Sequence, residues 1–138
     1  MTRVGRALLL VLTLALVALG SACGRGASSA AVEDYQVAFA VEPSPAAVGP
    51  ATVTVTIHDR DGKPVTGARV QVEGNMTHAG MKPVFADAAE VGDGRYVTDG
   101  FAFTMGGDWI LTARVTLPDG TAFEQAMDLP GVQGEEGH

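Results

Sequence analysis

The sequence predicts an all-β domain, an immunoglobulin-like antiparallel β-sandwich of about seven strands. Short segments in which apolar and polar residues alternate recur along the chain, and this period of two is typical of half-buried strands. Gly, Pro and Asp residues separate these segments at close spacing, as turns do. After the N-terminal region no helical period interrupts them. Cys23 is the only cysteine, so the disulfide of an immunoglobulin domain is not expected.

Each strand is predicted by its own alternation. The clearest segments are 52–58, where Val and Ile alternate with Thr, and 109–117, which is the longest. Residues 84–91 give a weaker signal, which fits either a strand or an irregular segment. The strands are expected at residues 35–41, 52–58, 68–73, 84–91, 95–98, 101–105, 109–117 and 121–129. The turns are expected at residues 59–64, 92–94 and 118–120.

Two methionines are assigned by their parity in these strands. Phe101, Phe103 and Met105 share one face of the segment 101–105, so Met105 can be a core residue. It can equally be a ligand, because the two glycines that follow it leave room for another loop to approach closely. Met127 shares a face with Phe123 and is expected in the core.

The N-terminal segment has the features of a bacterial lipoprotein signal peptide. Two arginines precede the apolar residues 7–19, and this apolar segment is shorter than the roughly 20 residues of a membrane span. Residues 19–23 resemble a lipobox, so Cys23 is expected to be the lipidated first residue of the mature protein. Gly20 stands where the motif has an aliphatic residue, which leaves an uncleaved anchor as the alternative. In either case the domain is expected outside the cytoplasm, anchored to the membrane on its periplasmic or cell-surface side.

The remaining chain is long enough for one domain with a modest core. We assign residues 1–22 to the signal peptide, 23–31 to Cys23 and a flexible tether, 32–130 to the sandwich and 131–138 to an acidic disordered tail. The formal net charge is −7, and it becomes about −9 without residues 1–22, which contain two arginines and no acidic residue. An acidic domain argues against binding to nucleic acid, whose phosphates need a basic surface.

A cluster of soft metal ligands lies in the segment 75–84. Met76, His78 and Met81 fall within six residues, in a loop that contains Gly80 and ends at Pro83. Thioether sulfur and imidazole suit Cu(I), whereas Mg²⁺ and Ca²⁺ need oxygen ligands. Met76 and His78 would share a face if the chain is extended, and a positive φ at Gly80 would turn Met81 back toward them. The cluster therefore predicts a copper site, with Met105 as a further candidate ligand.

Other candidate ligands are weaker. A single Met or His on a surface or in a core is common, so it is the clustering of these residues that indicates a metal. His58 falls on the threonine face of its strand and is expected to be solvated. His138 lies in the predicted tail, where any metal binding would be adventitious.

The order of these features resembles the YtkA-like domain, a family related to the FixH-like proteins of copper-dependent oxidase assembly. The resemblance covers about residues 50–117. It rests on an Asp-Gly-Lys-Pro-Val turn at 61–65, an Ala-x-Val strand at 68–70, the Met/His loop at 76–81, a Gly-x-Tyr step at 94–96 and Phe-x-Met-Gly-Gly-x-Trp at 103–109. It implies a small extracytoplasmic β-sandwich that handles copper. By position, Met76, His78, Met81 and Met105 would be the soft ligands, and Trp109 would belong to the scaffold.

The sequence thus leads to two functional hypotheses. The first is a lipid-anchored Cu(I)-binding protein, a metallochaperone or buffer that passes copper to an acceptor protein, such as an assembling cytochrome oxidase. The second is an interaction module without metal, in which Met76 and Met81 contact a protein partner. An enzyme is not expected, because no nucleophile elbow, phosphate-binding loop or His-Glu-x-x-His motif occurs.

Overall fold

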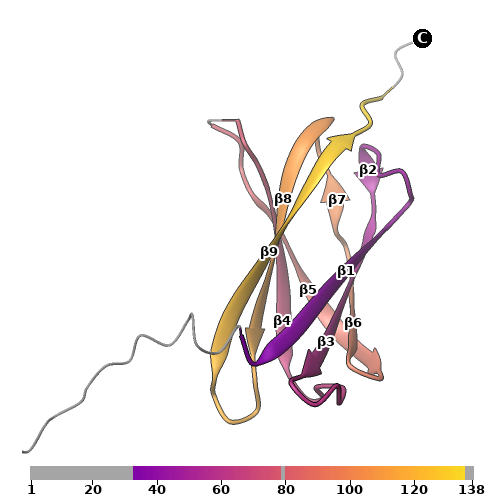
Figure 1. Cartoon of the computed structure of the whole chain (residues 1–138). Coiled ribbons are helices and arrows are strands. Elements are labelled where there is room, and N and C mark those ends of the chain that lie inside the picture. The colour runs from indigo at the N-terminus through magenta and orange to yellow at the C-terminus, as the bar shows by residue number, and fades with distance from the viewer. Residues whose placement is uncertain (1–32, 79, 136–138) are drawn as a thin grey trace, which may run out of the picture.

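The computed structural model describes residues 33–78 and 80–135, which form a β-structure (Figure 1). Its strands are β1 (Tyr35–Glu42), β2 (Gly49–Pro50), β3 (Thr52–Asp59), β4 (Arg69–Met76), β5 (Val84–Gly92), β6 (Arg95–Thr98), β7 (Ala102–Phe103), β8 (Gly107–Thr116) and β9 (Ala122–Val132). Within these ranges no helix is long and apolar enough to span a membrane. The predicted signal peptide, Cys23 and the tether lie outside the described residues, as does His138.

Seven strands form one antiparallel sheet in the order β1-β3-β6-β5-β4-β8-β9, and β2 pairs separately with β7. The change of layer occurs within β5, where Ala88 pairs with both Val70 of β4 and Thr98 of β6. The sheet folds over, and the Tyr35 ring of β1 stacks on Phe123 of β9 with centroids 5.0 Å apart. Grouped as β1-β3-β6-β5 and β4-β8-β9, the strands have the order of a constant-type immunoglobulin domain. The predicted fold class is therefore confirmed.

The core is built from the inward-facing residues that the alternation predicted. Buried and partly exposed residues alternate along β3 and β4, and β8 alternates from Trp109 to Thr116. At one end of the core the rings of Phe101, Phe103 and Trp109 follow one another edge to face, each pair with centroids 5.2 Å apart. Aromatic pairs in this arrangement stabilise a core beyond the area they bury.

Tyr96 joins β6 to the segment before β4. Its ring is fully buried, its hydroxyl group donates a hydrogen bond to the carbonyl of Val65 (2.9 Å), and the N–H of Ala68 donates to the hydroxyl oxygen (3.1 Å). Burial raises the pKa of Tyr96, the nearby Glu90 carboxylate raises it further, and the hydrogen bond from Ala68 acts in the opposite direction.

The predicted turns form as expected. The carboxylate of Asp59 accepts hydrogen bonds from the backbone N–H groups of Asp61 and Lys63, both 2.9 Å, while Gly62 has a φ of +80°. The N–H of Thr121 donates to the Asp119 carboxylate (2.9 Å), and together with the Thr121 hydroxyl group it lowers the pKa of Asp119.

Three boundaries differ from the prediction. The weak segment 84–91 is a full strand, β5, because it pairs with β4 over its first half and with β6 over its second. The segment 101–105 is extended only at Ala102–Phe103, where β7 pairs with β2. β9 continues to Val132, whose side chain is buried, and Gln133 forms backbone hydrogen bonds with Ala46 and Val48. Residues 131–133 therefore belong to the folded domain and not to the predicted tail.

Candidate metal centre

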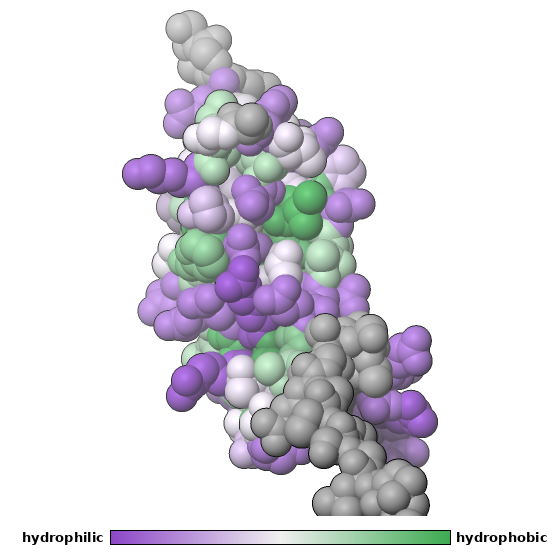
Figure 2. Space-filling model, turned by 90° about the vertical axis from the view of Figure 1, so that its left-hand side faces the viewer, coloured by the Kyte–Doolittle hydropathy of each residue, from purple (hydrophilic) through white to green (hydrophobic). Residues whose placement is uncertain are grey.

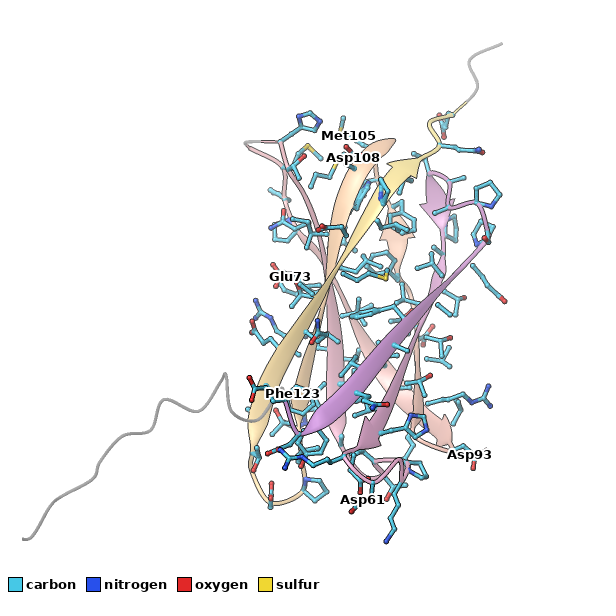
Figure 3. The ribbon with its side chains drawn as sticks, in the orientation of Figure 1. Asp61, Glu73, Asp93, Met105, Asp108 and Phe123 are labelled. Carbon is cyan, nitrogen blue, oxygen red and sulfur yellow. The ribbon has the colours of Figure 1, made fainter. Side chains whose placement is uncertain are left out.

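The predicted ligands lie at one end of the sandwich, where the connection from β4 to β5 meets the connection from β7 to β8. Figure 3 shows Met105 at this end and Asp61 and Asp93 at the opposite end. Residue pairing between the strands joins the two connections, because Met76, the last residue of β4, pairs with Trp109 of β8. Segments that are distant in the sequence are thus placed side by side.

Met76 belongs to β4 and not to the loop. Its side chain continues the inward face of Val70 and Val72 and is only 6 % exposed. The terminal methyl carbon lies 3.2 Å from the position that a Cβ on Gly107 would occupy. The thioether of Met76 is therefore under the backbone of Gly107, inside the sandwich.

His78 and Met81 follow the end of the strand. His78 is exposed, and because β4 ends at Met76, the expected shared face of Met76 and His78 does not extend along a strand. Met81 is partly buried and packs against the core cluster. Gly80 has a φ of +86°, the left-handed conformation that was expected to turn the chain at this point.

Met105 is outside the core, with 47 % of its surface exposed. Phe101 and Phe103 are each 1 % exposed, so the face that they share ends before Met105, where the chain bends. The interpretation of Met105 as a third core residue is therefore wrong. Its backbone is fixed by Trp109, whose indole N–H donates a hydrogen bond of 2.9 Å to the Met105 carbonyl.

The remaining candidates lie elsewhere. His58 is the next-to-last residue of β3, beside the turn at 59–64, at the end of the molecule where Figure 3 shows Asp61. Met127 is partly buried and packs against the core, as predicted. It pairs with Leu111 of β8 and not with Trp109, the partner of Met76.

The face of the β4, β8 and β9 layer that includes Glu73 is turned toward the viewer in Figure 2, and polar side chains cover much of it. Arg114 of β8 forms ion pairs with Glu73 and Glu124, and its guanidinium group lies 5.8 Å from the centre of the exposed Phe85 ring. These charges are paired with one another on the outer face of the layer.

The donor set suits a soft cation. In the part of the chain that the structure describes, no group of three or more His, Cys, Asp and Glu side chains is arranged to hold a metal ion. The candidate donors at the end of the sandwich that carries Met105 are the thioethers of Met76, Met81 and Met105 and the imidazole of His78. Thioethers and imidazole fit Cu(I) and not a hard cation. They range from exposed (His78 and Met105) through partly buried (Met81) to buried (Met76).

Reasoning from the sequence assigned Trp109 to the scaffold and did not assign Gly107 to the site. In the structure Trp109 pairs with Met76 and donates to the Met105 carbonyl, and Gly107 lies against the terminal methyl group of Met76. The signal that could have identified them is the Met-Gly-Gly-x-Trp pattern at 105–109, in which two glycines separate a methionine from a buried aromatic residue.

These features define a class of protein: a small immunoglobulin-like β-sandwich with methionine and histidine side chains at one end of its two layers. The family comparison agrees, because the model of the YtkA-like family matches residues 29–114, which is more than half of the chain. The protein therefore belongs to the YtkA-like family. No curated protein matches the chain significantly.

Proposed function

We propose that this protein is an extracytoplasmic copper-binding protein, a Cu(I) metallochaperone or buffer whose ligands are Met76, His78, Met81 and Met105. The observation that carries the proposal is the meeting of Met76 and Met105 at Trp109, since one pairs with this residue and the other accepts its indole hydrogen bond. Met76 at the end of β4 and Met105 in the connection from β7 to β8 are thus both held against the same residue. Membership of the YtkA-like family supports the same function.

The gradient of exposure suits a protein that takes up copper and releases it. Exposed His78 and Met105 can meet an incoming ion first, and Met81 and Met76 can then bind it deeper in the sandwich. Thioethers bind Cu(I) without losing a proton, so three of the four proposed ligands are ready to bind without deprotonation. Stepwise exchange of neutral ligands would pass the ion to an acceptor protein.

The cellular setting of the proposal comes from the sequence. Lipidation at Cys23 would hold the domain at the outer side of the membrane, and residues 24–31 would give it reach. A role in the assembly of copper enzymes, such as cytochrome oxidase, is the finer form of the proposal. The protein would act by binding and transfer, without catalysis of its own.

The second candidate function is an interaction module without metal. The exposure of Met105 favours it, because a flexible apolar side chain that is 47 % exposed at the end of a sandwich suits contact with a protein partner. The two functions differ in one property, which is stoichiometric binding of Cu(I).

The proposal is tested by competition for Cu(I) against a chromophoric chelator. The full chain is used in detergent micelles, with a Cys23→Ala substitution in every variant because a thiolate would bind copper itself. We expect one tightly bound equivalent, and an affinity at least about tenfold lower in Met76→Leu, His78→Ala, Met81→Leu and Met105→Leu. Leu nearly conserves the volume of Met, so the buried Met76 can be tested without a large loss of stability.

Met127→Leu is the matched control, since Met127 packs against the core away from the candidate ligands and should leave Cu(I) affinity unchanged. A wild-type chain that does not compete for Cu(I) would contradict the proposed function and leave the interaction module as the better hypothesis. An affinity that falls equally in Met127→Leu would mean that these four residues are not specific ligands.

A further inference from the structure

We infer that Trp109 and Gly107 are positioning residues for the copper site: they hold Met105 and Met76 in place without binding the ion. This inference rests on the proposed function. Trp109 is 1 % exposed, so its ring is not a surface for the metal or for a partner. It pairs with Met76 across β4 and β8, and its indole N–H donates to the Met105 carbonyl, so it contacts both of the residues that carry the proposed ligands.

The first contact fixes Met105. The indole N–H of Trp109 donates to the Met105 carbonyl across four residues, at 2.9 Å, and so closes the bend at 104–106 over the ring. Met105 is otherwise an exposed residue in a short connection rich in glycine. Without this hydrogen bond the bend would adopt more conformations. Binding a metal would then cost more conformational entropy, and the affinity would be lower.

The second contact fixes Met76. Gly107 has a φ of +125°, and a Cβ at this residue would lie 3.2 Å from the terminal methyl carbon of Met76. A glycine is therefore favoured by the backbone conformation, and a Cβ at this position would push the end of the Met76 side chain aside by a few tenths of an ångström. Because Met76 also pairs with Trp109 across β4 and β8, its thioether is confined between the backbone of Gly107 and the core.

The aromatic rings behind Trp109 make this arrangement rigid. Phe103 meets Trp109 edge to face, and Phe101 meets Phe103 in the same way. A Cβ at Gly74 would lie 2.7 Å from the Phe101 ring, so the ring also fills the space above β4. The packed rings therefore hold Trp109 in one position. The backbone of Met105 and the end of the Met76 side chain lie against this rigid part of the core.

Pre-positioning matters more for thioethers than for charged ligands. A neutral sulfur atom gains no long-range attraction from a cation, so the affinity of such a site depends on how many sulfur atoms are already in place. Loss of Trp109 as a donor should therefore lower the affinity through Met105, even though Trp109 does not touch the ion.

The test is a double-mutant cycle between Trp109 and Met105. Ag(I), a redox-stable analogue of Cu(I), is titrated into the full chain in detergent in the Cys23→Ala background. We expect Trp109→Phe to lower the affinity about five- to tenfold, as follows from the loss of one hydrogen bond. In the Met105→Leu background the same substitution should have less than about a twofold effect, because the residue through which Trp109 acts is then no longer a ligand.

Two controls separate positioning from general loosening of the core. Phe123→Leu removes a core ring at the end of the molecule opposite Met105 and leaves Trp109 and the rings behind it in place, so its affinity should stay within about twofold of the wild type (Figure 3). Gly107→Ala should lower the affinity, whereas Gly49→Ala should not. Gly49 has a similar φ of +119° and nothing within 4 Å of an added Cβ, so it reproduces the backbone strain without pressing on Met76.

The outcomes are distinguishable. A wild-type chain that does not bind Ag(I) or Cu(I) overturns the proposed function, and this inference with it. If the wild type binds and Trp109→Phe binds equally well, only the inference is overturned. It is also overturned if Trp109→Phe has the same effect with and without Met105, or if Phe123→Leu lowers the affinity as much as Trp109→Phe does.

Discussion

The hydroxyl group of Tyr96 belongs to a fully buried residue and forms hydrogen bonds with two backbone groups. It donates to the Val65 carbonyl and accepts from the Ala68 N–H, so one side chain of β6 ties down the segment that leads into β4. We expect Tyr96→Phe to reduce the free energy of unfolding by about 1–3 kcal/mol, because both backbone groups lose their partner. Urea unfolding followed by circular dichroism measures the change. A variant as stable as the wild type would mean that water replaces the hydroxyl group without cost.

The raised pKa of Tyr96 also predicts how stability changes with pH. In the unfolded chain the hydroxyl group ionises near pH 10, whereas burial delays ionisation in the folded protein. Above about pH 10 the folded state therefore retains this proton more often than the unfolded state does. The free energy of unfolding is unaffected below that pH, and it decreases as the pH rises toward the pKa of the folded protein. Absorbance of tyrosinate resolves the delayed titration, and Tyr35, the only other tyrosine, provides the comparison. This pH dependence should disappear in Tyr96→Phe.

At the scale of the elements, the turn between β5 and β6 shows how closely a connection can be packed. Gly92, Asp93 and Gly94 all have positive φ values, but only Gly94 is buried against another strand. A Cβ at Gly94 would lie 2.5 Å from the carbonyl oxygen of Ile57 in β3, whereas an added Cβ at Gly92 would meet nothing within 4 Å. The backbone of this turn is thus part of the packing between β3 and β6.

We therefore expect Gly94→Ala to destabilise the protein by about 3 kcal/mol or more and Gly92→Ala by only about 1–2 kcal/mol. Both substitutions impose a left-handed conformation on a residue with a Cβ, and only Gly94→Ala adds a clash with the backbone. Thermal unfolding of the two variants gives the difference. Equal losses of stability would show that the strain of a positive φ dominates and that the turn can move away from Ile57.

The strands that sequence periodicity predicted best are those with one buried face. β1, β3 and β8 alternate because only one face of each contacts the core, and their bounds are close to the predicted ones. β5 gave a weak signal because it changes layer at Ala88, so no single face stays inside along its length. Phe101 to Met105 seemed to form one face, but the alternation cannot show that the chain bends after Phe103.

The site could be predicted only in part, for a related reason. Met76, His78 and Met81 are close in the sequence, so their clustering was visible there. The contact of Met76 with Gly107 depends on the register between β4 and β8, which are neighbours in the sheet but not in the sequence. The hydrogen bond from Trp109 to Met105 depends on a bend whose geometry no local pattern specifies.

At the scale of the whole molecule, the two edge strands of the folded sheet meet only at particular points. β1 and β9 are the outermost strands, and they are held together by the stack of Tyr35 on Phe123, with an interplanar angle of 5°. Near the other end, Gln133 bonds to Ala46 and Val48 and joins the end of β9 to the segment after β1. Between these points the side chains of Phe39, Val41, Met127 and Leu129 line a pocket of about 330 Å³. Closure of the sandwich on this side thus relies on few contacts.

This arrangement predicts that Tyr35→Leu will destabilise the protein by about 1 kcal/mol, while Tyr35→Phe will have little effect, because the stack needs the ring and not the hydroxyl group. The free energy of unfolding in urea measures both variants. Hydrogen exchange should show faster exchange in β1 and β9 of Tyr35→Leu and unchanged protection in β4, which lies inside the sheet. If exchange rises equally in β4, the stack supports the whole core; if it rises nowhere, the two edges are held together without it.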